Sequence, residues 1–485
     1  MMKKSHMTIG LDEKPTNQVE LISNHPFILT NCAASDFKSA TPSTTEARSS
    51  SVIMATVQLE VISRELIKPS SQTPHHLRNY NLSYFDQLSP RKYIPLVLFY
   101  NPCNTTFETS ILLKKSLSET LAFYYPFAGK VKDQEFIDCN DEGILFLEAK
   151  VKLKLSEILE NPKHEILDLL FADNLQWNDT NLSTLLAVQV SYFDCGGMAL
   201  SVCMSHKIGD AATMVNFVND WAAKASNSGK QVSPLLYTPS IFPRGDLTLM
   251  PQPEYSIKKE TCSSRRFVFD AQKIAALKAI VADKVQKATK VEVVSALLYK
   301  CAISAANASS SGTTRPILFL QNVNLRTRMI PPLPENYVGN ISWVFPVPKR
   351  EDSLHCLVGQ MKEALSDFCN TYVKNVRGTE LALSISKTME KMRAMFKSSK
   401  QCVQYNCSSW CRFPVYEADF GWGKPVWVSI GACLDKNVII LMDSKSGDGI
   451  EAFVTLEEQD MAAFECDEEL LAFAALNPTP LTSQV

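Results

Sequence analysis

The strongest local feature of the sequence is the segment His206-Lys207-Ile208-Gly209-Asp210. An imidazole titrates near neutral pH, so a histidine held at the end of a strand can take a proton from a hydroxyl group. A four-residue gap would place His206 and Asp210 on one face of a helix, but Gly209 and the preceding strand pattern argue against a helix. We therefore expect a turn that sends the two side chains apart. Taken alone, the spacing also fits an ordinary histidine at a strand end.

The second feature is the segment Asp419-Phe420-Gly421-Trp422-Gly423. Gly421 and Gly423 flank a bulky aromatic residue, which permits a sharp turn and a close approach of the backbone. Two interpretations remain open at this point. The segment is either a tight turn around a core tryptophan or a loop with a role in catalysis.

Hydrophobic periodicity predicts the elements that position these residues. Residues 185–193 and 198–205 read as two strands of a hairpin, with a turn at 194–197 and His206 at the end of the second strand. After Asp210 the pattern becomes helical. Further strands are expected at 57–67, 95–100 and 267–269, and helices at 113–121, at 274–281 and from a capping box formed by Thr289 and Glu292.

The length of 485 residues fits two domains of ordinary size. Residues 33–51 are rich in Ser, Thr and Ala and lack a hydrophobic period, and acidic residues argue against a transit peptide. Met54 then begins a well-patterned segment and is a plausible natural start. We predict four parts: a disordered or dispensable extension (1–53), an N-terminal domain (54–224), a Pro-, Ser- and Gly-rich linker (225–263) and a C-terminal domain (264–485).

The composition argues against several classes of protein. The 49 lysines and arginines nearly balance the 51 aspartates and glutamates, for a net charge of −2, so we expect no nucleic-acid partner. No apolar run approaches the length of a transmembrane span, and no secretory signal is evident, so we expect no membrane association. The 14 cysteines follow no zinc-binding or disulfide pattern. We therefore expect reduced thiols, no metal and a cytoplasmic location.

Together the two segments resemble the HxxxD and DFGWG signatures of the BAHD family, plant enzymes that use acyl-coenzyme A. The resemblance runs in order, with similar spacing, from about residue 57 to about residue 475. The matching blocks are IKPSSQTP at 67–74, FDQL at 85–88, YYPFAGK at 124–130, FDCGG at 193–197, SHKIGDAATM at 205–214, SRRFVFDA at 264–271, VEVVSALLYKC at 291–301, NLRTRMIPPLP at 324–334, GN at 339–340 and SSWCRFPVYEADFGWGKPVWV at 408–428.

This resemblance implies a mixed α/β fold of two similar coenzyme A-dependent acyltransferase domains, joined by a long crossover loop, with a solvent channel between them. His206 would lie in the channel as the general base, reached by the acyl donor from one side and by the alcohol from the other. Asp210 would turn away and pair with Arg326, which keeps the histidine loop in shape.

The resemblance also bears on the remaining site residues. Asp419 is often called catalytic in this family, but we expect it to support the loop that contains Gly421, Trp422 and Gly423. Trp422 and the adjacent amides would help to shape the donor side or the oxyanion region. Arg265 and Arg266, with Lys258 and Lys259 nearby, form the local basic cluster that we assign to the coenzyme A phosphates. A solvated basic strand start is the alternative interpretation of that cluster.

The blocks at 67–74, 193–197 and 408–425 most resemble the alkaloid O-acetyltransferase branch of the family. Our leading hypothesis is therefore that a monomer moves an acetyl group from acetyl-coenzyme A to a hydroxyl of a plant specialised metabolite, such as a monoterpenoid indole alkaloid. The alternatives are an acylsugar- or volatile-ester-forming acyltransferase and a non-catalytic binding paralogue. A serine hydrolase and a nucleotide-binding enzyme are disfavoured, because the sequence has no GxSxG, GxGxxG or phosphate-loop motif.

Overall fold

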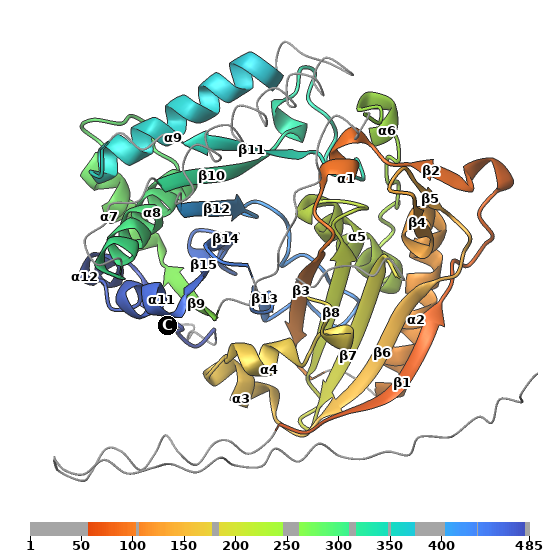
Figure 1. The fold of residues 1–485 in the computed structure, drawn as a ribbon. Helices are drawn as coiled ribbons and strands as arrows, with labels where there is room; N and C mark the ends of the chain where they lie inside the picture. The colour runs from red at the N-terminus through yellow and green to blue at the C-terminus, as the bar shows by residue number, and fades with distance from the viewer. Residues whose placement is uncertain are drawn as a thin grey trace, which may run out of the picture. The chain divides into compact units, whose positions relative to one another are not determined.

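The computed structural model describes residues 57–102, 106–176, 184–245, 261–309, 317–347, 351–373, 403–433 and 435–480. Strands and helices mix throughout this part of the chain and form two large sheets flanked by helices (Figure 1). This arrangement confirms the predicted mixed α/β class. The predicted extension, residues 1–53, lies outside the described residues, as do residues 246–260 of the predicted linker.

The first large sheet has six strands in the order β1-β6-β7-β8-β3-β13. Its members are β1 (Leu59–Ile67), β3 (Tyr93–Tyr100), β6 (Ile144–Val151), β7 (Leu186–Phe193), β8 (Met198–Ser205) and β13 (Trp427–Ser429). Every residue of β3, β7 and β8 is buried, because apolar clusters cover both faces of the sheet. The predicted hairpin is confirmed, since β7 and β8 pair antiparallel with Leu186 opposite Met204.

Two segments cross between the halves of the chain. Strand β13 comes from the C-terminal part but pairs with β3, where Trp427 lies opposite Phe99 and the two rings stack 5.2 Å apart. Helix α1 (Tyr84–Leu88) comes from the N-terminal part but packs into the core of the second sheet. There the ring of Phe85 lies 5.4 Å from that of Trp343. Residues far apart in sequence are therefore held together around the junction of the two sheets.

Two long helices cover one face of the first sheet: α2 (Thr106–Phe123) and α5 (Ala211–Ala225). Both helices were predicted, and apolar side chains of each are buried, among them Leu113, Leu117 and Leu121 of α2 and Met214 and Phe217 of α5. Trp221 of α5 donates its indole N–H to the carbonyl oxygen of Leu113 on α2 at 3.2 Å. This contact fixes α5, whose first turn follows the HKIGD segment directly.

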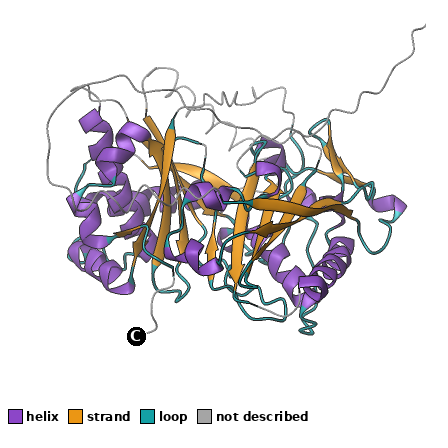
Figure 2. Cartoon of the chain, turned by 90° about the horizontal axis from the view of Figure 1, so that it is seen from below, coloured by secondary structure: helices purple, strands orange, loops and turns teal. Residues whose placement is uncertain are grey.

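The second large sheet has seven strands in the order β11-β10-β12-β14-β15-β9-β16. They are β9 (Cys262–Phe269), β10 (Ile317–Asn324), β11 (Ser342–Val347), β12 (Val403–Ser409), β14 (Val438–Asp443), β15 (Ile450–Glu457) and β16 (Ala475–Leu476). The helices of this half are α7 (Ala271–Val281), α8 (Lys290–Ser309), α9 (Leu354–Phe368), α11 (Glu458–Phe464) and α12 (Glu468–Phe473). Figure 2 shows the strands of the two sheets as separate groups with helices beside them.

Helix α8 is, among the described helices, the one long and apolar enough by length and composition to cross a membrane, which the sequence analysis had not anticipated. Most of its apolar side chains, including Val294 and Leu298, are buried in the core of the second sheet, which accounts for the apolar composition. The predicted capping box is confirmed at its N-terminus. The Glu292 N–H donates to Thr289 Oγ1 at 3.2 Å, and the Thr289 N–H donates to the Glu292 carboxylate at 2.8 Å.

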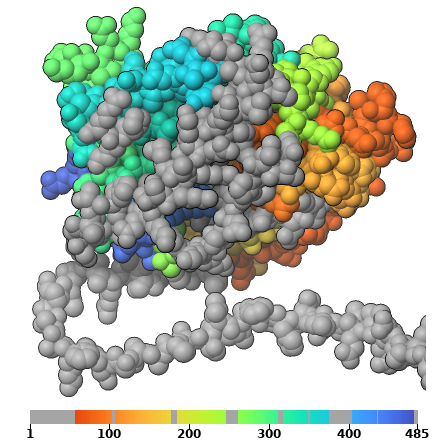
Figure 3. All heavy atoms as spheres, turned by 45° about the horizontal axis from the view of Figure 1, so that its top comes forward, coloured from red at the N-terminus to blue at the C-terminus, as the bar shows by residue number. Residues whose placement is uncertain are grey.

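The smaller elements lie between and around these layers. A three-stranded sheet contains β2 (Asn79–Asn81), β5 (Phe136–Asp138) and β4 (Lys130–Lys132), in that order. Short helices are α3 (Leu155–Glu160), α4 (His164–Asp168) and α6 (Thr238–Ile241), and single turns are η1 (His75–Leu77), η2 (Tyr125–Ala128), η3 (Ala172–Asn174), η5 (Arg326–Arg328) and η6 (Cys369–Val373). Helix α9 lies at the molecular surface (Figure 3, cyan) and presents one apolar face inward.

Candidate active site

His206 comes immediately after β8, where this strand leaves the first sheet. Its backbone N–H donates to the carbonyl oxygen of Lys92 at 2.7 Å, which extends the β3–β8 ladder by one bond. Residues 206–208 then turn. A Cβ atom at Gly209 would lie 2.5 Å from Cγ2 of Thr213, so a larger residue there would force the turn to shift. As predicted, the turn gives His206 and Asp210 different partners.

The imidazole of His206 is held by a side chain from the other half of the chain. Its Nδ1 lies 2.8 Å from Oδ1 of Asn340. The amide Nδ2 of Asn340 donates at 2.7 Å to the backbone carbonyl oxygen of His206. Among the described residues, no partner engages the other ring nitrogen, Nε2. The ring therefore has a fixed orientation and one free nitrogen.

Burial determines the charge state of this ring. It lowers the pKa of His206 below the ordinary value, although Asp210 and the ring's hydrogen bonds to its own carbonyl and to Asn340 partly oppose that effect. The imidazole is consequently neutral near pH 7. A neutral ring with a free Nε2 is the form that can accept a proton.

Asp210 and Arg326 form the predicted pair. Arg326 Nη1 lies 2.8 Å from one carboxylate oxygen and Nη2 lies 3.1 Å from the other, and the guanidinium is fully buried. Asp210 also caps α5 by accepting the Thr213 N–H at 3.0 Å, and it accepts the Ile341 N–H at 3.0 Å. Burial alone would raise the pKa of Asp210, but the charge of Arg326 and these hydrogen bonds hold it below the ordinary value. The carboxylate oxygens are thus occupied by these donors, and none of these bonds joins Asp210 to the His206 ring.

A cavity of about 170 Å³ adjoins His206. Its lining includes hydroxyl and amide side chains, among them Ser408 and Asn322, and the rings of Trp410 and Phe413. Apart from His206 and the paired Asp210, the described residues that line this cavity are neutral. The site can therefore hold a small uncharged group beside the free imidazole nitrogen.

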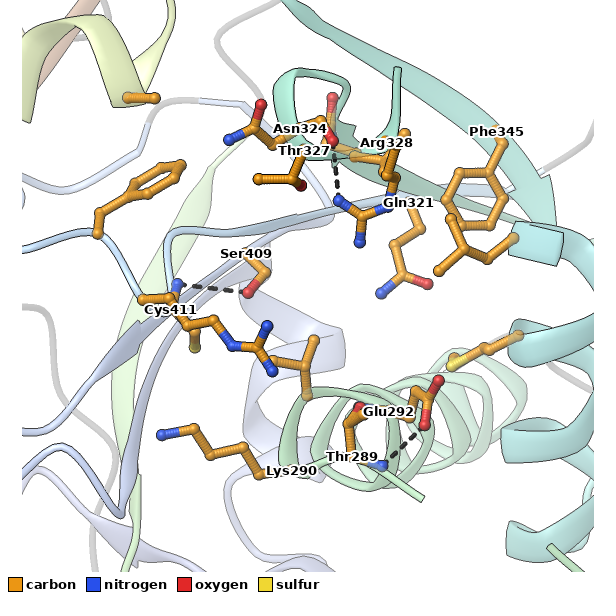
Figure 4. A pocket seen from close by; sticks show the side chains of 18 of the residues that line it. Thr289, Lys290, Glu292, Gln321, Asn324, Thr327, Arg328, Phe345, Ser409 and Cys411 are labelled. Carbon is orange, nitrogen blue, oxygen red and sulfur yellow. Dashed lines mark hydrogen bonds between the residues drawn. The ribbon is translucent and has the colours of Figure 1, made fainter. Parts of the chain in front are cut away.

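A larger cavity of about 870 Å³ adjoins the first, because the two share Asn324 and Ser409 among their lining residues. Its walls carry five basic side chains: Lys278, Lys287, Lys290, Arg328 and Arg412. Figure 4 shows Arg328 extending toward the cavity from the β10 side and Lys290 lying at the start of α8. Arg328 also donates to the carbonyl oxygen of Asn324 at 2.8 Å. A basic cavity thus leads toward the neutral one at His206.

Comparison with known proteins agrees with this geometry. The sequence matches the model of the Transferase family over residues 57–471, which contain both signature motifs.

This chain belongs to the BAHD acyltransferase family.

Relatives and a solved structure support the same assignment. The chain is 43% identical to akuammiline synthase 1 of Alstonia scholaris over 86% of its own length and 98% of that protein. It is 40% identical to 17,18-epoxy-17-hydroxycur-19-ene N-malonyltransferase of Strychnos nux-vomica over 87% and 92%. The crystal structure of vinorine synthase superposes with a TM-score of 0.75 at 34% identity, covering 86% of this chain and 98% of that one. This BAHD acyltransferase is therefore an acyl-coenzyme A-dependent O-acyltransferase with the two-domain fold that its motifs implied.

The assignment of Arg265 and Arg266 to the coenzyme A phosphates needs correction. The Nε of Arg265 lies 2.6 Å from the Glu465 carboxylate, and Arg266, which is 3% exposed, lies 2.7 Å from Glu451 and over the ring of Trp427. Neither arginine lines either cavity of this BAHD acyltransferase. Strand β9 lies between β15 and β16 in the sheet, so these guanidinium groups meet acidic side chains of their own half.

Asp419 organises a turn outside both cavities. Its Oδ1 accepts the Gly421 N–H at 2.8 Å and the Gly423 N–H at 2.9 Å, and both glycines have positive φ angles, of 108° and 104°. Phe420 packs edge-on against Trp221 at 5.0 Å. Because Asp419 takes both amides, they are not available to an oxyanion, contrary to the role considered for this region. The described contacts give Asp419 an architectural position.

Neither Asn340 nor Asp86, the residue behind it, was predicted as a site residue. Both lay in blocks that matched the family, GN and FDQL, but no periodic pattern connects them to His206. The basic residues of the larger cavity were also missed, because they come from α7, the loop between α7 and α8, α8, η5 and the loop after β12.

Proposed function

We propose that this BAHD acyltransferase transfers an acetyl group from acetyl-coenzyme A to a hydroxyl of an alkaloid. His206 is the general base of this reaction. The observation that carries the proposal is a partly buried, neutral His206 with a free Nε2, which lines a small neutral cavity that adjoins a larger basic one.

The chemistry follows from the state of the ring. His206 Nε2 takes the proton of the acceptor hydroxyl as its oxygen attacks the thioester carbonyl carbon. The carbon–sulfur bond then breaks, the new ester leaves, and the imidazolium returns the proton to the coenzyme A thiolate. The imidazole ends neutral, as it began, and no covalent enzyme intermediate is required. Much of the rate acceleration would come from holding base, hydroxyl and thioester in one orientation.

The basic cavity is the site that we assign to coenzyme A. The cofactor carries several phosphate charges, and arginine and lysine side chains bind phosphate oxygens by charge-assisted hydrogen bonds. Arg412 and Lys290 line this cavity, although Lys290 also pairs with Asp443 at 2.7 Å, and the walls include Glu292 and Glu335. The shared lining residues would let the pantetheine arm pass from the phosphate site toward His206.

The character of the smaller cavity supports acetyl as the acyl group. A malonyl group ends in a carboxylate. Burying a carboxylate without a partner costs roughly several kcal/mol of desolvation free energy. The described lining residues offer no cationic side chain to pair with it. An acetyl methyl group needs no such partner. The distinction is informative because one 40% identical relative is named an N-malonyltransferase.

The acceptor is assigned by similarity to the relatives. Akuammiline synthase 1 and diaboline synthase, at 43% and 39% identity, point to an alkaloid, while limonoid acetyltransferases from Melia azedarach and Citrus sinensis, at 38%, form a second group. A hydroxylated monoterpenoid indole alkaloid is therefore the first acceptor to test, and a limonoid alcohol the second.

The decisive experiment measures free thiol release by the purified chain. Acetyl- or malonyl-coenzyme A is mixed with each member of a panel of alcohols, with wild type and His206→Ala in parallel. We expect thiol release that needs both acetyl-coenzyme A and an alkaloid alcohol and falls by about 100- to 10,000-fold in His206→Ala, with unchanged circular dichroism. Full activity of that variant would refute the mechanism. Thiol release without any alcohol would indicate a hydrolase. No thiol release with either donor would indicate a non-catalytic binding paralogue.

We also propose that the protein is a cytoplasmic monomer. The unpatterned cysteines, which fit a reducing compartment, support the location. Cell fractionation and size-exclusion chromatography with light scattering test the two parts separately.

A further inference from the structure

Asp86 lies directly behind the side chain that holds His206. It sits on the short helix α1 and is 1% exposed. One carboxylate oxygen accepts the Asn340 backbone N–H and the Asn340 side-chain Nδ2, both at 2.8 Å. The other accepts the Ser83 N–H at 2.9 Å and the Ser83 hydroxyl at 2.6 Å. A buried carboxylate that receives four donors is a fixed acceptor.

This acceptor determines which way the amide of Asn340 faces. The Nδ2 group of Asn340 has two neighbours that only accept hydrogen bonds, Asp86 Oδ1 and the carbonyl oxygen of His206. Both of its protons are therefore committed. The amide oxygen must face the ring, where it lies 2.8 Å from Nδ1. A carbonyl oxygen in that position requires Nδ1 to carry the ring proton, which leaves the lone pair on Nε2.

We propose that Asp86 is a positioning residue that sets the tautomer of His206 through Asn340. The inference rests on the proposed function, in which His206 is the base, and it names a carboxylate of the reaction machinery that does not touch substrate. It also gives the HxxxD histidine an orienting acid that is not the aspartate of its own motif, because Asp210 is committed to Arg326.

The position of Asp86 is independently fixed. Phe85, beside it, packs against Phe242 at 4.9 Å and Trp343 at 5.4 Å in the second core. The buried amine of Lys207 donates to the carbonyl oxygens of Asp86 at 3.3 Å and Gln87 at 2.7 Å. Helix α1 is thereby tied both to the second core and to the loop of His206. Because Asp86 is held from two sides, it can hold the amide of Asn340 in one orientation.

The test compares Asp86→Asn with Asp220→Asn. Asp220 is a matched control, because it is also a buried carboxylate of the same half that accepts hydrogen bonds, from Tyr124 at 2.8 Å and Lys230 at 2.9 Å, but it has no contact with Asn340 or His206. The tautomer is read from the ring nitrogen shifts in protein labelled with ¹⁵N-histidine, and the His206 signal is assigned with His206→Gln. Steady-state rates are measured on the same samples.

We expect wild type and Asp220→Asn to show a proton on Nδ1 and none on Nε2. In Asp86→Asn the new amide can turn its own N–H groups toward Asn340, so a mixture of tautomers should appear. The value of kcat should fall by at least about 10- to 100-fold, the effect of removing a hydrogen-bond partner behind a metal-ligating histidine. KM for the donor should stay within about twofold of wild type, because Asp86 does not line the cavities.

Several results would overturn the proposal. One is a wild-type ring with its proton on Nε2, which needs no variant. Another is an Asp86→Asn protein that keeps the wild-type tautomer, whatever its activity, because a loss of rate without a change of tautomer would be structural. A changed tautomer with an unchanged kcat would also contradict it. If Asp86→Asn does not fold, Asn340→Ala is read in the same way. The ring signal is independent of turnover, so failure of this inference and failure of the proposed acyl transfer are distinguishable.

Discussion

Arg326 and Asp210 lie 116 residues apart in the sequence and meet as a buried ion pair with two hydrogen bonds. Arg326 also donates to the carbonyl oxygens of Tyr337 and Gly339, next to Asn340, while Asp210 caps the helix that follows His206. The pair therefore joins the loop that contains the imidazole to the loop that orients it.

A double-mutant cycle tests this relationship. We expect Asp210→Asn and Arg326→Met each to lower the free energy of unfolding by about 3–5 kcal/mol, because each leaves a buried group without its partner. The double variant should lose less than the sum of the single variants, since no charge then remains unpaired. Urea unfolding followed by circular dichroism measures all four proteins. Additive losses would show that the two side chains are not coupled.

Exchanging the two charges should not restore stability. At position 210 the other neighbours are the N–H groups of Thr213 and Ile341, which need an acceptor. At position 326 they are carbonyl oxygens, which need a donor. An arginine at position 210 would meet N–H donors, and an aspartate at position 326 would meet carbonyl acceptors, so neither could form hydrogen bonds with these neighbours.

Asp419 should matter for stability rather than for the chemical step. In Asp419→Ala the amides of Gly421 and Gly423 lose their acceptor, which we expect to cost about 1–3 kcal/mol of unfolding free energy. Asp419→Asn keeps an oxygen at the same place and should retain most of the stability and activity. A loss of kcat in Asp419→Asn as large as that in His206→Ala would instead show a direct role in catalysis.

Arg412 tests the assignment of the basic cavity to coenzyme A. Arg412→Gln should raise the KM for acetyl-coenzyme A about tenfold, the equivalent of one charge-assisted hydrogen bond, with little change in kcat. The effect should shrink at high salt, which screens exposed charges. Lys300→Gln is the control, because Lys300 pairs with Glu469 and does not line the cavity. Equal KM values for both variants would place the phosphates elsewhere.

The pH dependence of kcat/KM should report the imidazole of His206. Only the neutral ring accepts a proton, so activity should fall as pH decreases through its pKa. Burial lowers that pKa, so the acidic limb should lie below 6.5, the ordinary value for histidine. A midpoint above 6.5 would mean that a different group, or a charged ring, controls the reaction.

The pKa of Asp168 leads us to expect a second pH effect, on the free energy of unfolding. Its carboxylate accepts the Ala432 N–H at 2.9 Å, and burial raises its pKa from 3.8 to about 6. Between these values the folded protein binds more protons than the unfolded chain, so the contribution of Asp168 is greatest below 3.8 and is lost as pH rises through about 6. The stability of Asp168→Asn relative to wild type should therefore increase across this range. A constant difference between the two proteins would contradict the shifted pKa.

Local patterns in the sequence were sufficient for the elements that frame the site. Alternation predicted β7 and β8, the change of period after Asp210 predicted α5, and the order of the motifs led to the family. These features depend on neighbours a few residues apart, which a linear pattern records. The same patterns did not reveal that Arg265 and Arg266 pair with Glu465 and Glu451, since a run of basic residues does not show which acids oppose it across a sheet.

By itself the sequence determined that His206 ends a strand, that a turn separates it from Asp210, and that the chain is a BAHD acyltransferase. Only the tertiary structure decided what the ring is bonded to. Asp86 and Asn340 are 254 residues apart, and they meet because α1 crosses into the second core while β13 crosses into the first sheet. Hydrogen bonds of that separation depend on how two cores pack, and no short-range pattern of residues encodes that packing.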